Sequence, residues 1–152
     1  MTEHTRNGFV VLPPNSPHLT VVKVGGRDFI VAKSAAVLWR RWLTFLNAVE
    51  PFTEKGWDGG YSHRKIGHSD VWSEHAAGMA CDQNAAQHVQ GHELPDGYTD
   101  VQVRLIRWAL KNTAAGRAIH WGADFNTTPD PMHYEVRSPE ILAEYNRKYP
   151  GK

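Results

Sequence analysis

Two segments of the chain combine histidines with carboxylates, the side chains that can bind a metal ion. The first contains His75 and Asp82, and the second, farther along the chain, contains Asp130 and His133. Imidazole nitrogen and carboxylate oxygen bind Zn²⁺ at about 2.0–2.2 Å, and a catalytic zinc keeps three protein ligands and one position open for water. His75, Asp82 and His133 could therefore be the three ligands, which would leave Asp130 free to act as a base.

The chemistry that such a site would support is hydrolysis. Three ligands of which one is a carboxylate leave a net charge of about +1 at the zinc, and this charge lowers the pKa of a bound water toward about 7. A base must lie within one hydrogen bond of that water without being a ligand itself, which Asp130 would satisfy. Arg64, in the loop before the first segment, could neutralise an oxyanion or a substrate carboxylate by a bidentate contact.

The spacing alone does not decide between this site and ordinary structural positions. His75 and His133 could be core or surface histidines, and Asp82 could be a turn or capping residue. Asp130 precedes a proline, as residues that begin a turn often do. Arg64 could be a solvated loop charge, and motif matches of this kind also occur by chance in histidine-rich chains.

The composition is that of an ordinary globular domain. The chain has 152 residues, of which 41% are hydrophobic and 22% charged, and this length suits a single domain over residues 1–152. The formal net charge is +1. Proteins that bind nucleic acid usually carry a basic surface that neutralises phosphates, so this class is disfavoured. One cysteine, Cys81, excludes an internal disulfide.

The sequence gives no indication of insertion into a membrane. No apolar run approaches the roughly 20 residues of a membrane-spanning helix. The first residues, MTEHTRNG, lack the charged-then-apolar pattern of a signal peptide. We therefore expect a monomeric protein that is made in the cytoplasm and needs outside help to act elsewhere.

The first half of the chain predicts a hairpin, a helix and a long loop. Residues 1–19 are rich in proline and form an extended arm. Residues 19–24 and 29–32 are apolar and β-branched and predict a hairpin closed by glycines. Ser34 is expected to cap a helix that runs to about Val49, and the glycine-rich stretch after it is a loop.

The second half predicts short strands between two further helices. A capping box at Thr99 begins one helix, which has Val101, Leu105 and Trp108 on one side and is closed by Gly116. In chain order we expect a strand over 78–83, a loop over 88–97, a helix over 99–113, strands over 118–121 and 133–136, and a helix that Ser138 caps. This irregular alternation predicts an α+β fold in which helices pack against a small antiparallel sheet.

Three linked motifs resemble those of a known family. SEHAAGMACD over residues 73–82 matches the SxHxxGxAxD signature of the zinc D-alanyl-D-alanine carboxypeptidase and VanY-like peptidase family. GGYSHR over 59–64 is similar to the family's GGY…R segment. WG at 121–122 with DPMHYE at 130–135 resembles its WG…DxMHxE segment. The motifs come in the family's order and cover residues 57–137.

The resemblance implies a role for each residue at a motif position. His75, Asp82 and His133 correspond to the zinc ligands, and Asp130 corresponds to the acid/base. Arg64 corresponds to the arginine that polarises the scissile carbonyl. The fold implied is of the hedgehog and DD-peptidase type, with the zinc site at the sheet.

The resemblance also implies contacts around the metal and the substrate. Ser73 and Tyr61 correspond to substrate-binding positions. Trp57, Trp72 and Trp121 could line a groove, although aromatic side chains lie more often in a core.

One further position supports a ligand, and two others depart from the pattern. Glu135 is expected to hydrogen-bond a ligand histidine from behind. Cys81 stands where an aliphatic residue is more usual. Ala123 follows Gly122 where the family often has a second glycine.

The function implied is hydrolysis of an amide bond in the stem peptides of peptidoglycan. The sequence looks most like the phage endolysin branch, which implies cleavage of the L-Ala–D-Glu bond during cell lysis. Removal of a terminal D-Ala is the alternative within the family. A zinc-bearing module that binds the cell wall without catalysis is the alternative from another class.

Overall fold

The protein combines α-helices with two small antiparallel sheets, which confirms the predicted α+β class. The computed structural model describes residues 1–53 and 59–151. Within these ranges the chain forms a two-stranded sheet, a three-stranded sheet and four α-helices. No helix in the described part of the chain is long and apolar enough to cross a membrane.

The two-stranded sheet is the predicted hairpin. Strands β1 (Leu19–Val24) and β2 (Arg27–Ala32) are antiparallel and pair along their whole length. Gly25 and Gly26 connect them, and both have a positive φ, as the two central residues of a type I′ turn require. The turn is therefore as short as a hairpin allows.

Helix α1 (Ala36–Val49) lies at the centre of the core. The prediction that Ser34 caps it is wrong, because a 3-10 turn, η1 (Lys33–Ala35), precedes the helix and no side chain caps either element. The backbone N–H of Ala36, at the start of the helix, donates to the Lys33 carbonyl. This amide therefore needs no hydrogen bond to a serine side chain. The helix buries five side chains: Leu38, Trp39, Trp42, Leu43 and Leu46.

Helix α2 (Asp100–Asn112) begins with the predicted capping box at Thr99. The prediction that Gly116 closes it is wrong. Thr113 leaves the helical conformation, and its side chain accepts a hydrogen bond from the Gly116 N–H to begin a new helix, α3 (Ala114–Arg117). A side chain on Gly116 would overlap the last turn of α2, so glycine permits the close packing of the two helices.

The apolar stripe predicted on α2 does lie on one side of the helix, but it faces outward. Val101, Leu105 and Trp108 are exposed. Ile106 and Ala109 instead contact the core.

The three-stranded sheet carries the residues that matter for chemistry. Strand β5 (His133–Val136) lies between β3 (Ala80–Asp82) and β4 (Ile119–Trp121), and both pairings are antiparallel. In the β3–β5 register Asp82 lies directly opposite His133. The strand pairing itself therefore brings two of the predicted ligands together.

Helix α4 (Pro139–Lys148) follows β5 and begins as predicted. The Ser138 side chain accepts a hydrogen bond from the Ile141 N–H, and Pro139 occupies the first turn. This is the position where a proline costs no hydrogen bond.

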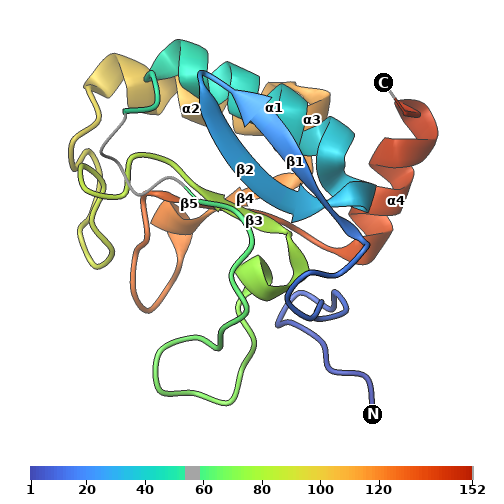
Figure 1. The fold of residues 1–152 in the computed structure, drawn as a ribbon. Coiled ribbons are helices and arrows are strands. Elements are labelled where there is room, and N and C mark those ends of the chain that lie inside the picture. Colours follow the sequence, from blue (N-terminus) through green and yellow to red (C-terminus); the bar gives the residue numbers. More distant parts are fainter. Residues whose placement is uncertain (54–58, 152) are drawn as a thin grey trace.

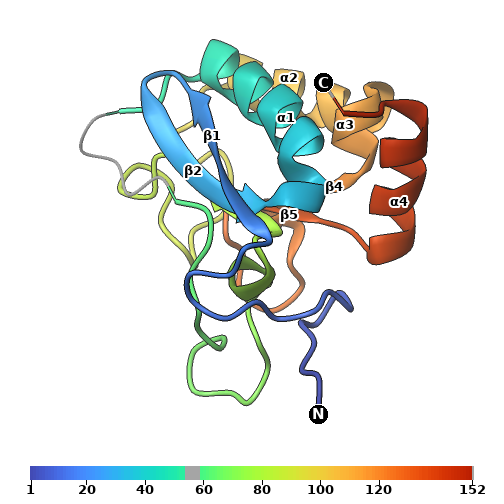
Figure 2. The ribbon, with the colours of Figure 1, turned by 45° about the vertical axis from the view of Figure 1, so that its right-hand side comes forward.

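The arrangement separates helices from loops. Figure 1 shows α1 and α2 along one side of the sheets, while the loop after residue 60 and the loop after β4 extend from the opposite side. The 45° turn of Figure 2 keeps this separation and shows the N-terminal arm beside the loops. The arm is irregular, as expected, but it is packed down, because Phe9 is buried in the core.

Candidate metal centre

One cavity beside β3 and β5 brings together most of the side chains that the sequence singled out. Its volume is about 320 Å³. Seven predicted site residues line it: Arg64, Ser73, His75, Asp82, Asp130, His133 and Glu135.

A tight turn places His75 in this cavity. The residue lies on a 3-10 turn, η2 (Glu74–Ala77), which the Ser73 hydroxyl caps by accepting the His75 backbone N–H at 3.2 Å. Gly78 ends the turn with a φ of 69°, and a side chain there would overlap the backbone of Ala32. The sequence predicts a strand over 78–83, but Gly78 belongs to the end of this turn. Strand β3 therefore begins at Ala80, two residues later than predicted.

The ring of His75 presents a lone pair to Asp82. Its Nδ1 lies 2.7 Å from the carbonyl oxygen of Gly60, and because a carbonyl can only accept, Nδ1 carries the proton. In the neutral ring Nε2 is then an acceptor. It is buried without a hydrogen-bond partner, at 3.3 Å from Asp82 Oδ2. Two acceptors that face each other in a buried place require a cation or a proton between them.

His133 repeats this arrangement from the other side. Its Nε2 lies 2.8 Å from Glu135 Oε1, so Nε2 donates to the carboxylate. Its Nδ1 lies 3.2 Å from Asp82 Oδ1. Asp82 therefore has a histidine nitrogen beside each of its oxygens.

A single Zn²⁺ fits these three side chains. One donor atom from each of His75, Asp82 and His133 lies within 4.8 Å of the other two. Ligands at 2.0–2.1 Å from a tetrahedral zinc are roughly 3.3 Å apart. The two rings lie at a similar distance from Asp82 but beside different oxygens, with His75 Nε2 3.3 Å from Oδ2 and His133 Nδ1 3.2 Å from Oδ1. Each ring also donates its other N–H to an oxygen, as zinc-binding histidines usually do.

The electrostatics of the metal-free cluster favour positive charge at the same point. Burial acts to lower the pKa of His133, but hydrogen bonds with Asp82 and Glu135 outweigh it and raise this pKa to about 10. Burial acts to raise the pKa of Asp82, but the charge of His75 and the hydrogen bond with His133 outweigh it and lower this pKa. The cluster thus attracts protons or a cation to the space that its donor atoms share.

Asp130 lies in the same cavity with one oxygen unengaged. Its Oδ1 is buried and has no hydrogen-bond partner. Burial raises the pKa of this carboxyl to about 6, although the charge of His133 opposes the rise. The Asp130 N–H donates to the Gly122 carbonyl at 2.8 Å, and Gly122 has no room for a side chain against Asp130 and His133. A fixed carboxylate with a pKa near neutrality is suited to accept and return a proton.

Arg64 lines the cavity from the loop before η2. It is exposed, and its charge acts to lower the pKa of Asp130. The Ser73 N–H donates to the Arg64 carbonyl at 3.1 Å, which ties this loop to the turn that carries His75. The Arg64 side chain therefore lines the same cavity as Asp130 and the three candidate metal ligands.

Comparison with known proteins agrees with this geometry. Residues 67–136 match the family model described as D-alanyl-D-alanine carboxypeptidase. This segment is similar to the D-alanyl-D-alanine carboxypeptidase family and covers a little under half of the chain. No curated protein and no solved structure matches the chain. The family segment contains the three ligand candidates and Asp130, while Arg64 lies just before it.

Two other residues at the family's motif positions do not line the cavity. The hydroxyl of Tyr61 donates to the Leu12 carbonyl at 2.6 Å, and the side chain borders a different hollow, beside β1. The prediction that Trp121 contacts substrate is wrong, because Trp121 is fully buried and its Nε1 donates to the Pro131 carbonyl at 2.7 Å. Trp121 instead supports the loop that leads to the candidate ligand His133.

The remaining groove predictions have separate outcomes. Trp72 contacts His63 and Lys65 rather than the cavity. Trp57 lies outside the described residues. Glu135, by contrast, supports His133 from behind as predicted.

Sequence reasoning missed two residues that contact this candidate site. Arg6 and Asn7, in the N-terminal arm, hydrogen-bond the carboxylate of Glu135. Their segment carries no motif and lies far from Glu135 in the sequence, so no local pattern could have indicated the contact.

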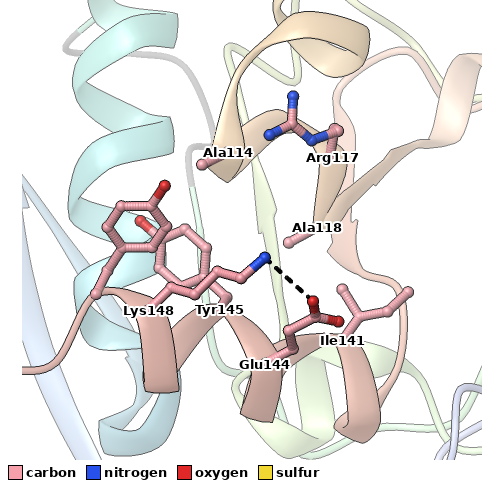
Figure 3. Close-up of a pocket in the computed structure, with 8 residues that line it drawn as sticks. Ala114, Arg117, Ala118, Ile141, Glu144, Tyr145 and Lys148 are labelled. Carbon is pink, nitrogen blue, oxygen red and sulfur yellow. Dashed lines mark ion pairs between the residues drawn. The ribbon is translucent and has the colours of Figure 1, made fainter.

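A second hollow lies between α3 and α4 and has a different character (Figure 3). Lys148 and Glu144, one turn apart on α4, form an ion pair at its edge, with Nζ 3.2 Å from Oε1 (Figure 3). Arg117 and Tyr145 also line it. Among the described residues no histidine or cysteine lines this hollow, so it offers no ligand set that competes with the family site.

Proposed function

We propose that the protein is a zinc metallopeptidase that hydrolyses an amide bond in the stem peptides of peptidoglycan. One observation carries the proposal: a nitrogen of each of two buried histidines, His75 and His133, lies beside Asp82 at a cavity in which Asp130 has an unengaged oxygen. The match of residues 67–136 to a peptidase family model supports it.

The division of roles follows from the donor set. His75, Asp82 and His133 would hold the zinc, which supplies Lewis acidity toward a carbonyl oxygen and toward water. Asp130 takes a proton from the attacking water as its oxygen bonds to the scissile carbon. It then returns that proton to the amine nitrogen as the C–N bond breaks.

Arg64 and Ser73 act on the substrate in this proposal. The guanidinium of Arg64 stabilises the negative charge that develops on the carbonyl oxygen. Ser73 lines the same cavity, but its hydroxyl is already an acceptor for the turn of His75. Its contribution is therefore chiefly to hold that histidine in place.

We propose cleavage of the L-Ala–D-Glu bond, as in phage endolysins, because the sequence as a whole looks most like that branch. The matching family model, a D-alanyl-D-alanine carboxypeptidase, favours the alternative, release of a terminal D-Ala. Mass spectrometry of digested muropeptides separates the two, since only the carboxypeptidase releases free D-Ala.

The experiment that tests the proposal combines zinc analysis with hydrolysis of purified peptidoglycan. We expect about one zinc per chain, loss of zinc in His75→Ala, and a fall in rate of about 10²–10⁴-fold in Asp130→Asn with zinc retained. His92→Ala, an exposed histidine outside the cavity, is the matched control and should behave as the wild type. A wild type without zinc, or an active His75→Ala variant, would overturn the proposal.

The same variants decide against a binding module. A module that holds zinc and binds the wall without catalysis would release no fragments, and Asp130→Asn would change nothing. The buried oxygen of Asp130 that has no hydrogen-bond partner argues for catalysis. Burying a carboxylate oxygen without a partner destabilises a protein, and such groups are found mainly at functional sites.

A further inference from the structure

The N-terminal arm reaches the back of the metal centre through Glu135. We propose that Asn7 and Arg6 are positioning residues that hold the Glu135 carboxylate and thereby orient His133 for metal binding. The inference rests on the proposed zinc function, but it concerns residues outside the family segment, which begins at residue 67.

Asn7 makes the closest of these contacts. Its Nδ2 donates to Glu135 Oε2 at 2.6 Å and to the Val136 carbonyl at 3.0 Å. Its backbone N–H donates to Glu74 Oε2 at 3.0 Å. One residue therefore joins the strand that carries His133 to the turn that carries His75.

Arg6 supplies the charge that Glu135 needs. Its Nη2 lies 3.2 and 3.3 Å from the two oxygens of the Glu135 carboxylate. The Glu135 side chain is 2% exposed, whereas that of Arg6 is 48% exposed. The Arg6 guanidinium also lies 5.1 Å from the centre of the Phe125 ring. A buried carboxylate is stable only when its oxygens are paired and hydrogen-bonded.

These contacts divide the Glu135 carboxylate between two directions. Oε1 accepts from His133 Nε2 at 2.8 Å, and Oε2 accepts from Asn7. If Asn7 is removed, Oε2 keeps only the longer contact with Arg6 Nη2 at 3.3 Å, and we expect the carboxylate to turn toward a better partner. The hydrogen bond to His133, which keeps the ring's Nδ1 directed at Asp82, would then be lost or bent.

The arm is built to hold these two residues in place. Thr5 N–H donates to the Phe9 carbonyl at 2.8 Å, and the Thr5 hydroxyl accepts the Phe9 N–H at 3.1 Å. Thr5 also pairs with Trp72 in an isolated parallel bridge. With Thr5 and Phe9 both buried, residues 6–8 form a closed loop with two fixed ends, which lies beside η2 in both ribbon views (Figures 1 and 2).

The test measures zinc affinity by competition with a chelator in the full chain. Removal of a residue that holds a metal ligand from behind typically weakens metal binding by about 10–100-fold. We expect this loss in Asn7→Ala. The matched control is Asn146→Ala, because Asn146 also makes a long-range side-chain hydrogen bond, to the Ser34 carbonyl at 2.7 Å, but outside the cavity. Its zinc affinity should equal that of the wild type.

A second pair of variants keeps the test valid if Asn7→Ala does not fold. Arg6→Met removes the charge from a half-exposed side chain, and Arg6→Lys keeps it. We expect weakened zinc binding in the first variant and substantial recovery in the second. In the Co²⁺-substituted protein, the visible absorption spectrum should shift in Asn7→Ala and in Arg6→Met but not in Asn146→Ala.

A readout without metal separates this inference from the proposed function. The His133 Nε2–H proton should give a protected NMR resonance in the metal-free wild type, and it should lose protection in Asn7→Ala. If folded Asn7→Ala keeps both this resonance and the wild-type zinc affinity, the positioning role is refuted. If the wild type binds no zinc, the proposed function fails while the NMR result still decides the contact. If zinc binds but no stem peptide is cut, only the peptidase function fails.

Discussion

The buried carboxylate of Asp130 destabilises the folded protein, so we predict that Asp130→Asn loses activity but is more stable than the wild type. In Asp130→Asn the side chain keeps its shape but loses the charge that burial disfavours. The pKa of Asp130 rises from its ordinary value of 3.8 to about 6. For a fully buried group this rise corresponds to about 3 kcal/mol. Because Asp130 is only partly buried, we reduce the expected gain to about 1–2 kcal/mol.

The stability difference between Asp130→Asn and the wild type should depend on pH. A carboxyl whose folded pKa is raised binds more protons in the folded state than in the unfolded state between about pH 4 and pH 6. The wild type therefore loses stability as the pH rises through that window, and the full penalty is present above about pH 6. Asp130→Asn should be more stable than the wild type at pH 8 and nearly equal to it at pH 4.

The assay is urea unfolding of the chelator-treated protein at both pH values. For a protein of this size, about 1 kcal/mol also raises the melting temperature by about 2–4 °C. Asp28→Asn, an exposed aspartate on the hairpin, is the control and should change stability by less than about 0.5 kcal/mol at either pH. If Asp130→Asn is less stable than the wild type at pH 8, or if its gain does not shrink at pH 4, the reasoning about desolvation is wrong.

Three further predictions concern the metal centre and the turn that supports it. Zinc affinity should rise about tenfold per pH unit between pH 7 and pH 9, because His133, with a pKa of about 10, must lose a proton to bind metal. Chelator competition at three pH values measures this affinity, and an affinity that does not change with pH would contradict the prediction. Zinc at a free concentration of about 1,000 times its Kd should stabilise the protein by about 4 kcal/mol, and thermal unfolding with and without chelator measures the difference. Gly78→Ala should destabilise the protein by more than Gly26→Ala and should also weaken zinc binding. Both glycines have a positive φ, but only at Gly78 would the new methyl group overlap the backbone, so equal losses in urea unfolding would refute this contact.

Much of the local structure follows from short sequence patterns. The capping box at Thr99 and the serine cap before Pro139 predict two helix starts correctly, because each depends on hydrogen bonds within three residues. The cap assigned to Ser34 fails because the start of α1 is not set by local hydrogen bonds alone. Whether a 3-10 turn precedes α1 depends on how the hairpin meets the helix, which is not a local property.

The candidate ligands were also predictable, because their motifs are local. The pattern over 73–82 names His75 and Asp82, and the pattern over 130–135 names Asp130 and His133. A short motif of this kind records which side chains are present and at what spacing. It contains no information on which nitrogen of a ring is free or on whether an oxygen has a partner.

The tertiary structure decided everything that depends on contacts between distant parts of the chain. Pairing of β3 with β5 places Asp82 opposite His133. Burial removes Trp121 from any contact with substrate. The folded arm brings Asn7 to Glu135 across 128 positions of the sequence. The sequence by itself determined which side chains could bind a metal, since that is a property of residue type. Desolvation, strand register and long-range hydrogen bonds arise only when the elements pack. They decide which of those side chains are close enough together, and correctly oriented, to bind a metal.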